Sequence, residues 1–175
     1  MSNKKTSFKR CAGCPYNTGS TSTPIGLENN GSRYLLVFQA PGKDEWNGNT
    51  NSKQRIPIDS ENPHSAANRM RKSFDRKNKK RKDYDITEAV QCYPGQNTNK
   101  RDKKPRKSSQ NICKKYLKEE ISNNNYTDIF CFGKIAYDIV KDILENIKTN
   151  KKINCVEAAH PSSNVSNSAL DNSYK

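Results

Sequence analysis

The sequence has no long hydrophobic run. No segment approaches the ~18 consecutive apolar residues that a membrane-spanning helix requires, and the basic N-terminal segment is not followed by the apolar stretch of a secretory signal peptide. We therefore expect an intracellular, cytoplasmic protein without a membrane partner. Thiols stay reduced in that compartment, so we expect the six cysteines to bind a metal or to be buried rather than to form disulfides.

Hydrophobic residues are scarce along the whole chain. They make up 31% of the 175 residues, which is low for a compact fold, but they are clustered in short segments. A chain of this length can form one domain with a substantial core and is too short for two large ones. We therefore treat residues 1–175 as a single domain, and we expect the polar residues 1–10 and about 164–175 to be flexible.

Acidic residues are outnumbered by basic ones. The chain has 32 Lys and Arg against 18 Asp and Glu, which gives a formal net charge of +14, and it contains two dense basic runs, Arg69–Lys82 and Lys100–Lys107. A domain this basic usually binds a polyanion, and nucleic acid is the first candidate. The alternative is a biased composition in which many lysines only face solvent, but we favour phosphate contacts.

One segment dominates the predicted fold. Tyr34–Phe38 is an unbroken apolar run of strand-forming residues, which is typical of a strand buried on both faces. Ala40-Pro41-Gly42 follows it, where Pro41 cannot donate to a sheet and Gly42 tolerates backbone angles that other residues resist. Such a turn lies at the carboxyl edge of a parallel sheet, which is where ligands of open α/β sheets bind.

Strand-like and helix-like segments alternate along the rest of the chain. This alternation predicts an α/β fold, a three-layer α/β/α arrangement around a central four-stranded parallel sheet. The loops after strands one, two and four begin at Gln39, Glu88 and His160, and topology brings them to one crevice. The other elements are a polar loop over 43–62, a helix from Asn62 or Ser65 to about Phe74, a strand over 84–92, a lysine-rich loop over 97–109, a helix over about 109–122, a strand over 127–132, a helix with apolar residues from Ile135 to Ile147, and a strand over 153–159.

Five segments, in the same order, resemble the uracil-DNA glycosylase superfamily and in particular its iron–sulfur branch, usually called family 4. The resemblance extends from Cys11 to Ser163, and it implies the fold, the DNA substrate and the chemistry of that family. The segments are Cys11-x-x-Cys14-Pro15, Gln39-Ala40-Pro41-Gly42 with Glu45 three residues beyond the glycine, the strand that ends in Cys92, the helix that carries Cys113, and His160-Pro161-Ser162.

Four of the six cysteines match the cluster ligands of that branch. A set of four thiolates suits either a [4Fe–4S] cluster or a tetrahedral zinc ion. Spacing does not choose between them, and the resemblance favours an iron–sulfur cluster with a structural role. The other two cysteines, Cys131 and Cys155, lie in apolar strands, where we expect small buried side chains. The four candidate ligands are Cys11, Cys14, Cys92 and Cys113.

The resemblance also implies a reaction. The bond between the base and C1′ of deoxyribose would break through an oxocarbenium-like sugar, with His160 donating a hydrogen bond to O2 of the departing base anion. Gln39 would help to hold the attacking water, and Glu45 either does the same or is a solvated loop acid. The residues expected to contact the base or the DNA backbone are Ala40, Pro41, Gly42, Trp46, Ile58, Glu88, Ser162 and Ser163.

Three positions depart from the family 4 pattern. Glu88 stands where that family has an asparagine that pairs with uracil, and an ionised glutamate, which only accepts hydrogen bonds, suits a cytosine-like amino group better than O4 of uracil. Ile58 replaces a phenylalanine that stacks on the flipped base. Trp46 replaces an acidic residue and would restore an aromatic surface. We therefore hypothesise a base other than plain uracil, such as a cytosine derivative with a bulky substituent.

The combined prediction is a DNA glycosylase that hydrolyses the N-glycosidic bond of a flipped-out uracil or modified base and leaves an abasic site. It would be monofunctional, because no lysine stands where the family would use one as a nucleophile. We expect a monomer that acts on single- or double-stranded DNA, in base-excision repair or in defence against foreign DNA such as that of a phage. The alternatives are a catalytically inactive iron–sulfur DNA-binding protein of the same fold and a zinc-stabilised nucleic-acid module.

Overall fold

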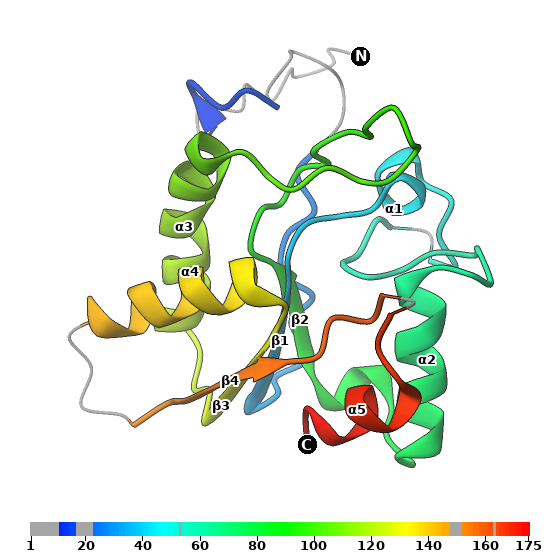
Figure 1. Ribbon diagram of the computed structural model, residues 1–175. Helices are drawn as coiled ribbons and strands as arrows, with labels where there is room; N and C mark the ends of the chain where they lie inside the picture. Colours follow the sequence, from blue (N-terminus) through cyan, green and yellow to red (C-terminus); the bar gives the residue numbers. More distant parts are fainter. Residues whose placement is uncertain (1–10, 17–22, 53, 148–151, 163) are drawn as a thin grey trace, which may run out of the picture.

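The computed structural model in Figure 1 describes residues 11–16, 23–52, 54–147, 152–162 and 164–175. Four strands form one parallel sheet in the order β2-β1-β3-β4, which confirms the predicted α/β fold. The elements in chain order are β1 (Tyr34–Phe38), α1 (Lys43–Asn47), α2 (Ala66–Arg76), the short 3₁₀ helix η2 (Arg81–Asp83), β2 (Asp85–Glu88), α3 (Lys107–Ser122), β3 (Asp128–Phe132), α4 (Lys134–Glu145), β4 (Asn154–Ala158) and α5 (Asn167–Asn172).

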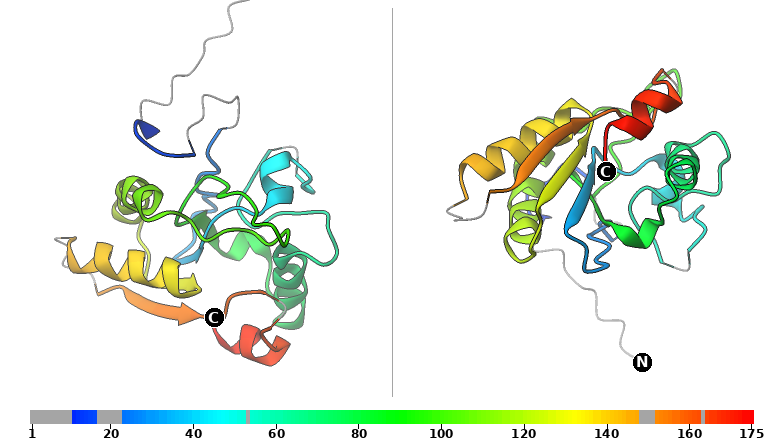
Figure 2. Two further views of the ribbon diagram at one scale, coloured as in Figure 1. Left: turned by 45° about the horizontal axis from the view of Figure 1, so that its top comes forward. Right: turned by 90° about the horizontal axis from the view of Figure 1, so that it is seen from below.

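The sheet is covered on both faces, as the apolar run of β1 predicts. Leu35 and Val37 pack with apolar residues of α3 and α4, whereas Leu36 and Phe38 pack with apolar residues of α2 and α5. Successive side chains of a strand point to opposite faces, so an apolar residue at every position buries both faces. The two further views in Figure 2 show the same three layers, with α3 and α4 on one side of the sheet and α2 and α5 on the other.

Two boundaries differ from the sequence-based expectation. The segment 43–62 was expected to be loop, but its first residues form the five-residue helix α1, in which Glu45 accepts a hydrogen bond from the backbone amide of Gly42. Strand β2 ends at Glu88 instead of continuing to Cys92. The backbone amides of Ala89 and Val90 still donate to carbonyls of the chain leaving β1, so the two chains separate gradually beyond the regular ladder.

The expectation that residues from about 164 onward are flexible is wrong for the part that the structure describes. These residues form α5, which packs against α2, and both Leu170 and Tyr174 are buried in the core. Asp171 pairs with Arg76 of α2 at 2.6 Å. The segment looked flexible because it is mostly polar, yet two apolar side chains and one ion pair are enough to dock a short helix on a formed core.

Several basic side chains of the run Arg69–Lys82 make contacts within the protein. Besides Arg76, Lys77 donates to the backbone carbonyls of Asp171 and Tyr174. Arg81 pairs with Glu28 and also donates to the carbonyl of Ile58. These cations neutralise or hold parts of the protein, so they are less available for phosphate contacts than the run suggests. No helix within the described ranges has the length and apolar character that crossing a membrane requires.

Replacing Leu170 by alanine tests whether α5 belongs to the core. Leu170 is fully buried, so Leu170→Ala removes apolar contacts and leaves a cavity, and we expect the free energy of unfolding to fall by about 2–4 kcal/mol. Urea denaturation followed by circular dichroism measures the change. Ser168→Ala, two residues earlier on an exposed position, should have little effect. Equal stability of the two variants would contradict the docking of α5.

Candidate active site

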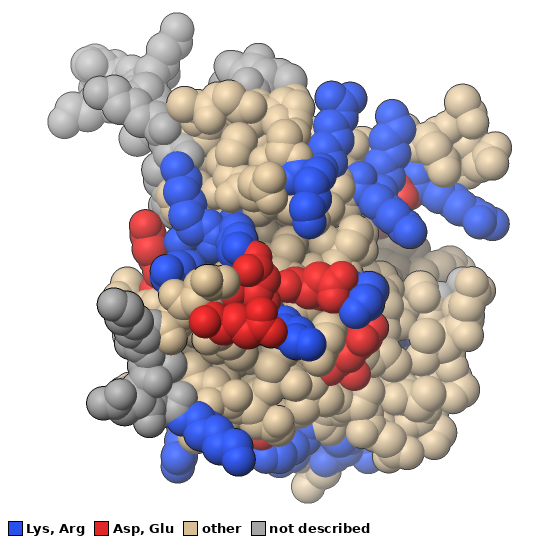
Figure 3. Space-filling model, turned by 60° about the vertical axis from the view of Figure 1, so that its left-hand side comes forward, with Lys and Arg blue, Asp and Glu red and all other residues tan. Residues whose placement is uncertain are grey.

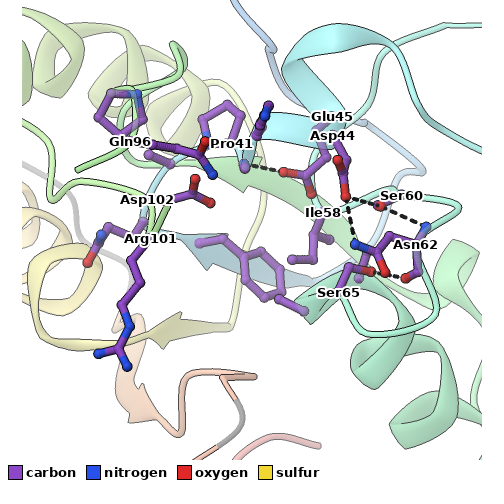
Figure 4. A pocket seen from close by; sticks show the side chains of 18 of the residues that line it. Pro41, Asp44, Glu45, Ile58, Ser60, Asn62, Ser65, Gln96, Arg101 and Asp102 are labelled. Atoms are coloured by element: carbon purple, nitrogen blue, oxygen red, sulfur yellow. Dashed lines mark hydrogen bonds between the residues drawn. The ribbon is translucent and has the colours of Figure 1, made fainter. Parts of the chain in front are cut away.

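A cavity of about 610 Å³ opens at the carboxyl edge of the sheet. Its walls come from the end of β1, from α1, from the loop that leads into α2, from the loop over 94–103 and from the segment after β4. Figure 4 shows these segments converging around Ile58 and Glu45. The lining includes seven of the predicted site residues: Gln39, Ala40, Pro41, Gly42, Glu45, Ile58 and His160.

Three other predicted residues do not line the cavity, and a fourth is not described. Trp46 does not line the cavity, and its ring instead lies against the guanidinium of Arg55 at 4.9 Å. Ser162 is exposed outside the lining, and its carbonyl accepts a hydrogen bond from Arg69. Glu88 is buried behind the lining. Ser163 lies outside the described residues.

The turn after β1 fixes one wall of the cavity. Gly42 precedes α1, and its amide donates to Oε2 of Glu45. A Cβ atom on residue 42 would come within 3.1 Å of that oxygen, so a larger residue would require the carboxyl group of Glu45 to shift, whereas Oδ2 of Asp102 at 3.5 Å would be in ordinary contact. The glycine thus allows the close approach of Glu45 to the backbone at the start of α1.

His160 enters the cavity from the end of β4. It is half-buried and packs against Gly133, whose φ of +94° strongly favours glycine and where a Cβ would lie 3.4 Å from the imidazole. Burial lowers the pKa of His160 below its usual value. The imidazole is therefore neutral at neutral pH, in which state one ring nitrogen carries a proton and can donate a hydrogen bond.

Two glutamates are buried at this end of the sheet. Glu88 is 1% exposed, and alternation along β2 puts it on the same face as Ile86 and Phe38. Neither of its carboxyl oxygens has a hydrogen bond of normal geometry among the described residues. The backbone amide of Ile58 approaches and lowers its pKa, but burial first and then Glu45 raise the pKa well above the usual value. Burial therefore favours the neutral acid form of Glu88, which argues against the premise of an ionised glutamate.

Glu45 differs from Glu88 because it reaches the cavity. It is 5% exposed and its pKa is raised to about 7, chiefly by burial. The hydrogen bond from Gly42 lowers the pKa, and the charges of Asp102 and Asp59 raise it. Glu45 thus changes its charge near neutral pH instead of remaining an ordinary solvated carboxylate.

Ile58 sits on a strained backbone. Its φ of +48° is unfavourable for a β-branched residue. Arg81 donates to the carbonyls of both Pro57 and Ile58 while it pairs with Glu28, and these contacts hold the loop in place. The result is an apolar side chain fixed at the floor of the cavity, beside Phe38.

Sequence reasoning missed two walls of the cavity. Lys100, Arg101 and Lys103, from the loop treated as a flanking basic run, line one side. That loop folds back on itself. The backbones of Gln96 and Asp102 form an isolated antiparallel β-bridge, and the hydroxyl of Tyr93 donates a hydrogen bond to Oδ1 of Asp102 at 2.9 Å. The opposite wall carries polar residues that no motif marked, and the residues are Ser60, Asn62, His64 and Ser65.

Charge on another side of the molecule is mixed. Figure 3 shows the side that α3 and α4 cover, where acidic side chains gather in the middle and lysines and arginines surround them. Lys114 pairs there with Asp142, and Lys134 pairs with Asp138 at 2.8 Å. The positive charge of the protein is thus partly compensated on this face.

The four candidate cluster cysteines are all buried and come together from three segments. Burial first, and then the other three thiols, raise the pKa of Cys92 to about 12, and the pKa of Cys113 is raised to about 11. A second cavity of about 220 Å³ is lined by Cys11, Cys92 and Cys113. Within the described residues, no three His, Cys, Asp or Glu side chains are spaced to hold a metal ion as they stand. The donor set, four buried cysteines of which three line this cavity, fits a thiolate-bound cluster in its chemistry.

The remaining two cysteines are distant from that set in the fold. Cys131 is buried among residues of α3 and α4, as expected, and Cys155 is half-buried beside it, with 3.9 Å between the sulfurs. In the register of β3 and β4, Cys155 is opposite Ile129, so the two cysteines are offset by two residues. Residues on such a diagonal are too far apart at Cα for an unstrained disulfide.

Comparison with known families shows to which family the chain belongs. A family model described as the Uracil DNA glycosylase superfamily matches residues 25–174. The chain belongs to this superfamily. Its match begins after Cys11 and Cys14, so it does not bear on the N-terminal cysteine pair. A search of curated proteins finds no match. The four-stranded parallel sheet with its flanking helices is consistent with the fold of this superfamily.

Replacing Glu88 by glutamine tests its neutral state. Between the pKa of an unfolded glutamate and the raised pKa of the folded one, the unfolded chain binds fewer protons, so stability falls as pH rises. We expect the wild-type protein to lose up to about 1.4 kcal/mol more than Glu88→Gln for each pH unit in that interval. Thermal unfolding without oxygen, from about pH 5 to about pH 8, measures the difference. Glu61→Gln, at an exposed position, serves as the control, and parallel curves for Glu88→Gln and wild type would contradict the assignment.

Proposed function

We propose that this protein is a monofunctional DNA glycosylase, which hydrolyses the N-glycosidic bond of a flipped-out uracil or modified base and leaves an abasic site. Membership of the superfamily supports this proposal. The observation that carries it is the convergence of Gln39, Glu45 and His160, which are far apart in sequence, on one cavity at the carboxyl edge of the sheet. A cavity of this size accommodates a turned-out nucleotide.

His160 would assist departure of the base. As the glycosidic bond breaks, negative charge develops on the base, and a hydrogen bond to O2 strengthens towards the transition state. A neutral imidazole suits this role, because it donates its N–H without first losing or gaining a proton at neutral pH. Gln39 and the backbone of Ala40–Gly42 would support the base and the attacking water, and Ile58 would provide apolar contact below the base.

The loop over 94–103 would bind the DNA backbone. Lys100, Arg101 and Lys103 stand at the cavity wall, where phosphates flanking a flipped nucleotide would pass. Such contacts release counterions and give weak, salt-dependent binding to either single- or double-stranded DNA. Ser162 and the backbone beside it remain candidates for a flanking phosphate, because Ser162 is exposed next to His160. We propose that the protein acts as a monomer.

We also propose that the four buried cysteines hold a [4Fe–4S] cluster, with zinc as the alternative. The ligands would be Cys11, Cys14, Cys92 and Cys113. The group would supply thiolate–metal bonds that tie the N-terminal segment to the chain after β2 and to α3, and no chemical step depends on it. The loop of the cavity wall lies between Cys92 and Cys113, so this anchoring would also limit its movement.

A second candidate function is a catalytically inactive DNA-binding protein of the same fold. The observation that favours it is the pair of departures at Glu88 and Ile58, because Ile58 lines the cavity without an aromatic face and Glu88 is buried behind it. Formation of an abasic site separates the two functions. An active enzyme would serve base-excision repair or defence against foreign DNA, and a preference for modified bases over uracil would favour defence.

A panel of oligonucleotides with uracil and modified bases tests the activity. We expect alkaline cleavage of abasic product for at least one base, and we expect His160→Ala to slow its formation by about 100-fold or more, because the donor to the base anion is lost. Ser168→Ala is the control, since that residue is exposed on α5 away from the cavity. Absence of product for every base, on single and double strands, would favour the inactive DNA-binding protein.

Iron content tests the cluster. Protein purified without oxygen should absorb at about 400 nm and contain iron and sulfide, whereas Cys92→Ser should lose most of both because one ligand is missing. Cys155→Ser is the matched control, because Cys155 lies in β4 beside Cys131 and outside the four-cysteine set. Stoichiometric zinc without iron would establish the alternative metal.

A further inference from the structure

We propose that Glu45, presented to the cavity as a neutral carboxylic acid, determines specificity by donating a hydrogen bond to an exocyclic carbonyl oxygen of the bound base. The pocket would then take oxo-pyrimidines, meaning uracil and its substituted derivatives, in preference to amino-pyrimidines of the cytosine type. This inference rests on the proposed glycosylase function and deepens it. It assigns Glu45 a role that requires its proton, whereas activating water as a general base would require the carboxylate.

The position of Glu45 is fixed by the turn that precedes it. Its Oε2 accepts the amide hydrogen of Gly42, which leaves Oε1 as the oxygen that can carry a proton. Figure 4 shows the side chain extending from α1 towards the turn at Pro41 and towards Ile58. Glu45 lines the cavity although it is only 5% exposed, so a base that enters the cavity would meet an almost fully desolvated carboxyl group.

The charges around Glu45 favour the protonated form. Asp102 faces it from the loop over 94–103 and Asp59 faces it from the loop before α2. Glu88, from β2, lies behind it and, as a carboxyl group, supplies no positive charge that would favour the ionised form of Glu45. The opposing cation is Arg81, which is already paired with Glu28 and with two backbone carbonyls.

The remaining charged groups of the cavity do not reverse this balance. Lys100, Arg101 and Lys103 line the opposite wall, and His160 is neutral because its pKa is lowered. Lys43, Asp44 and His64 also line the cavity, and none of these seven groups is among those that shift the pKa of Glu45 to about 7. Below that pH the acid holds its proton, and above it the proton is lost.

The hydrogen-bond pattern of the base then decides binding. A carboxylic O–H donor is satisfied by a carbonyl oxygen such as O4 of uracil, whereas an amino group in the same place sets donor against donor. Leaving the O–H donor without an acceptor in a desolvated pocket costs binding free energy, so the amino base binds more weakly than the oxo base. When Glu45 ionises, it becomes an acceptor only, and the preference weakens or reverses.

A matched pair of substrates tests the inference. Oligonucleotides that carry 5-hydroxymethyluracil or 5-hydroxymethylcytosine differ, at the target base, in the oxo or amino group at C4 and in the proton on N3. Single-turnover release of each base is measured from about pH 5.5 to about pH 8.5. We expect the oxo base to be released at least about tenfold faster at low pH. We expect its rate to fall about tenfold per pH unit above the pKa of Glu45, which is about 7.

Two variants identify the group. Glu45→Gln keeps a donor that does not titrate, so it should retain the rate on the oxo base at low pH within about threefold and remove the fall at high pH. Asp102→Asn removes one of the charges that raise the pKa of Glu45, so the fall should begin at lower pH. Asp75→Asn, an exposed position on α2, should leave the profile unchanged. Thermal unfolding confirms that each variant is folded.

The outcomes separate this inference from the function on which it rests. A rate that rises through neutral pH, together with an inactive but folded Glu45→Gln, would assign Glu45 to the water and overturn the inference while the glycosylase function stands. Faster release of the amino base at low pH would overturn it as well. Release of neither base, nor of any base in the wider panel, would overturn the function and the inference together.

Discussion

The parallel pairing of β1 with β2 and β3 is the constraint on which the rest of the structure depends. Register pairs Phe38 with Glu88 and Val37 with Cys131, so the chain leaves these strands at one edge. A fourth parallel strand brings His160 to the same edge. Both faces of the sheet are buried, and a shift of one residue would move every side chain to the wrong layer. The cavity is therefore located by the core and not by its own polar contacts.

Burial at that edge sets the chemistry of the site. The same apolar layers that hold Phe38 and Ile58 remove water from Glu88 and Glu45, and they lower the pKa of His160. Burial thus favours the neutral forms of these three groups where the departing base would lie. Positive charge is kept at the wall formed by the loop over 94–103, where a phosphate and not a base would be expected.

Much of this arrangement could be predicted from the sequence. The apolar run of Tyr34–Phe38 and the turn after it predicted the central strand, because a hydrophobic pattern is a local property. The expectation of a parallel sheet brought Gln39 and His160 to one edge. The helix α1 could not be predicted, since five polar residues carry no periodic pattern. Nor could the neutral state of Glu88, because a pKa depends on burial that only the folded chain creates. The docking of α5 rests on Leu170 and Tyr174, too few residues to form a pattern.

The contacts of Arg69 attach helix α2 to the segment that follows the candidate catalytic histidine, His160. This residue of α2 donates to the carbonyls of Ser162 and Val165, and α2 is also the helix on which α5 docks. The segment that follows His160 is thereby held by Arg69 and by the docking of α5. Neither Arg69 nor α5 lines the cavity. Substitutions at Arg69, or at the positions of α2 that contact α5, can therefore displace the imidazole of His160 by loosening the backbone that carries it. In a screen that measures activity alone, such variants would be indistinguishable from variants of the active site.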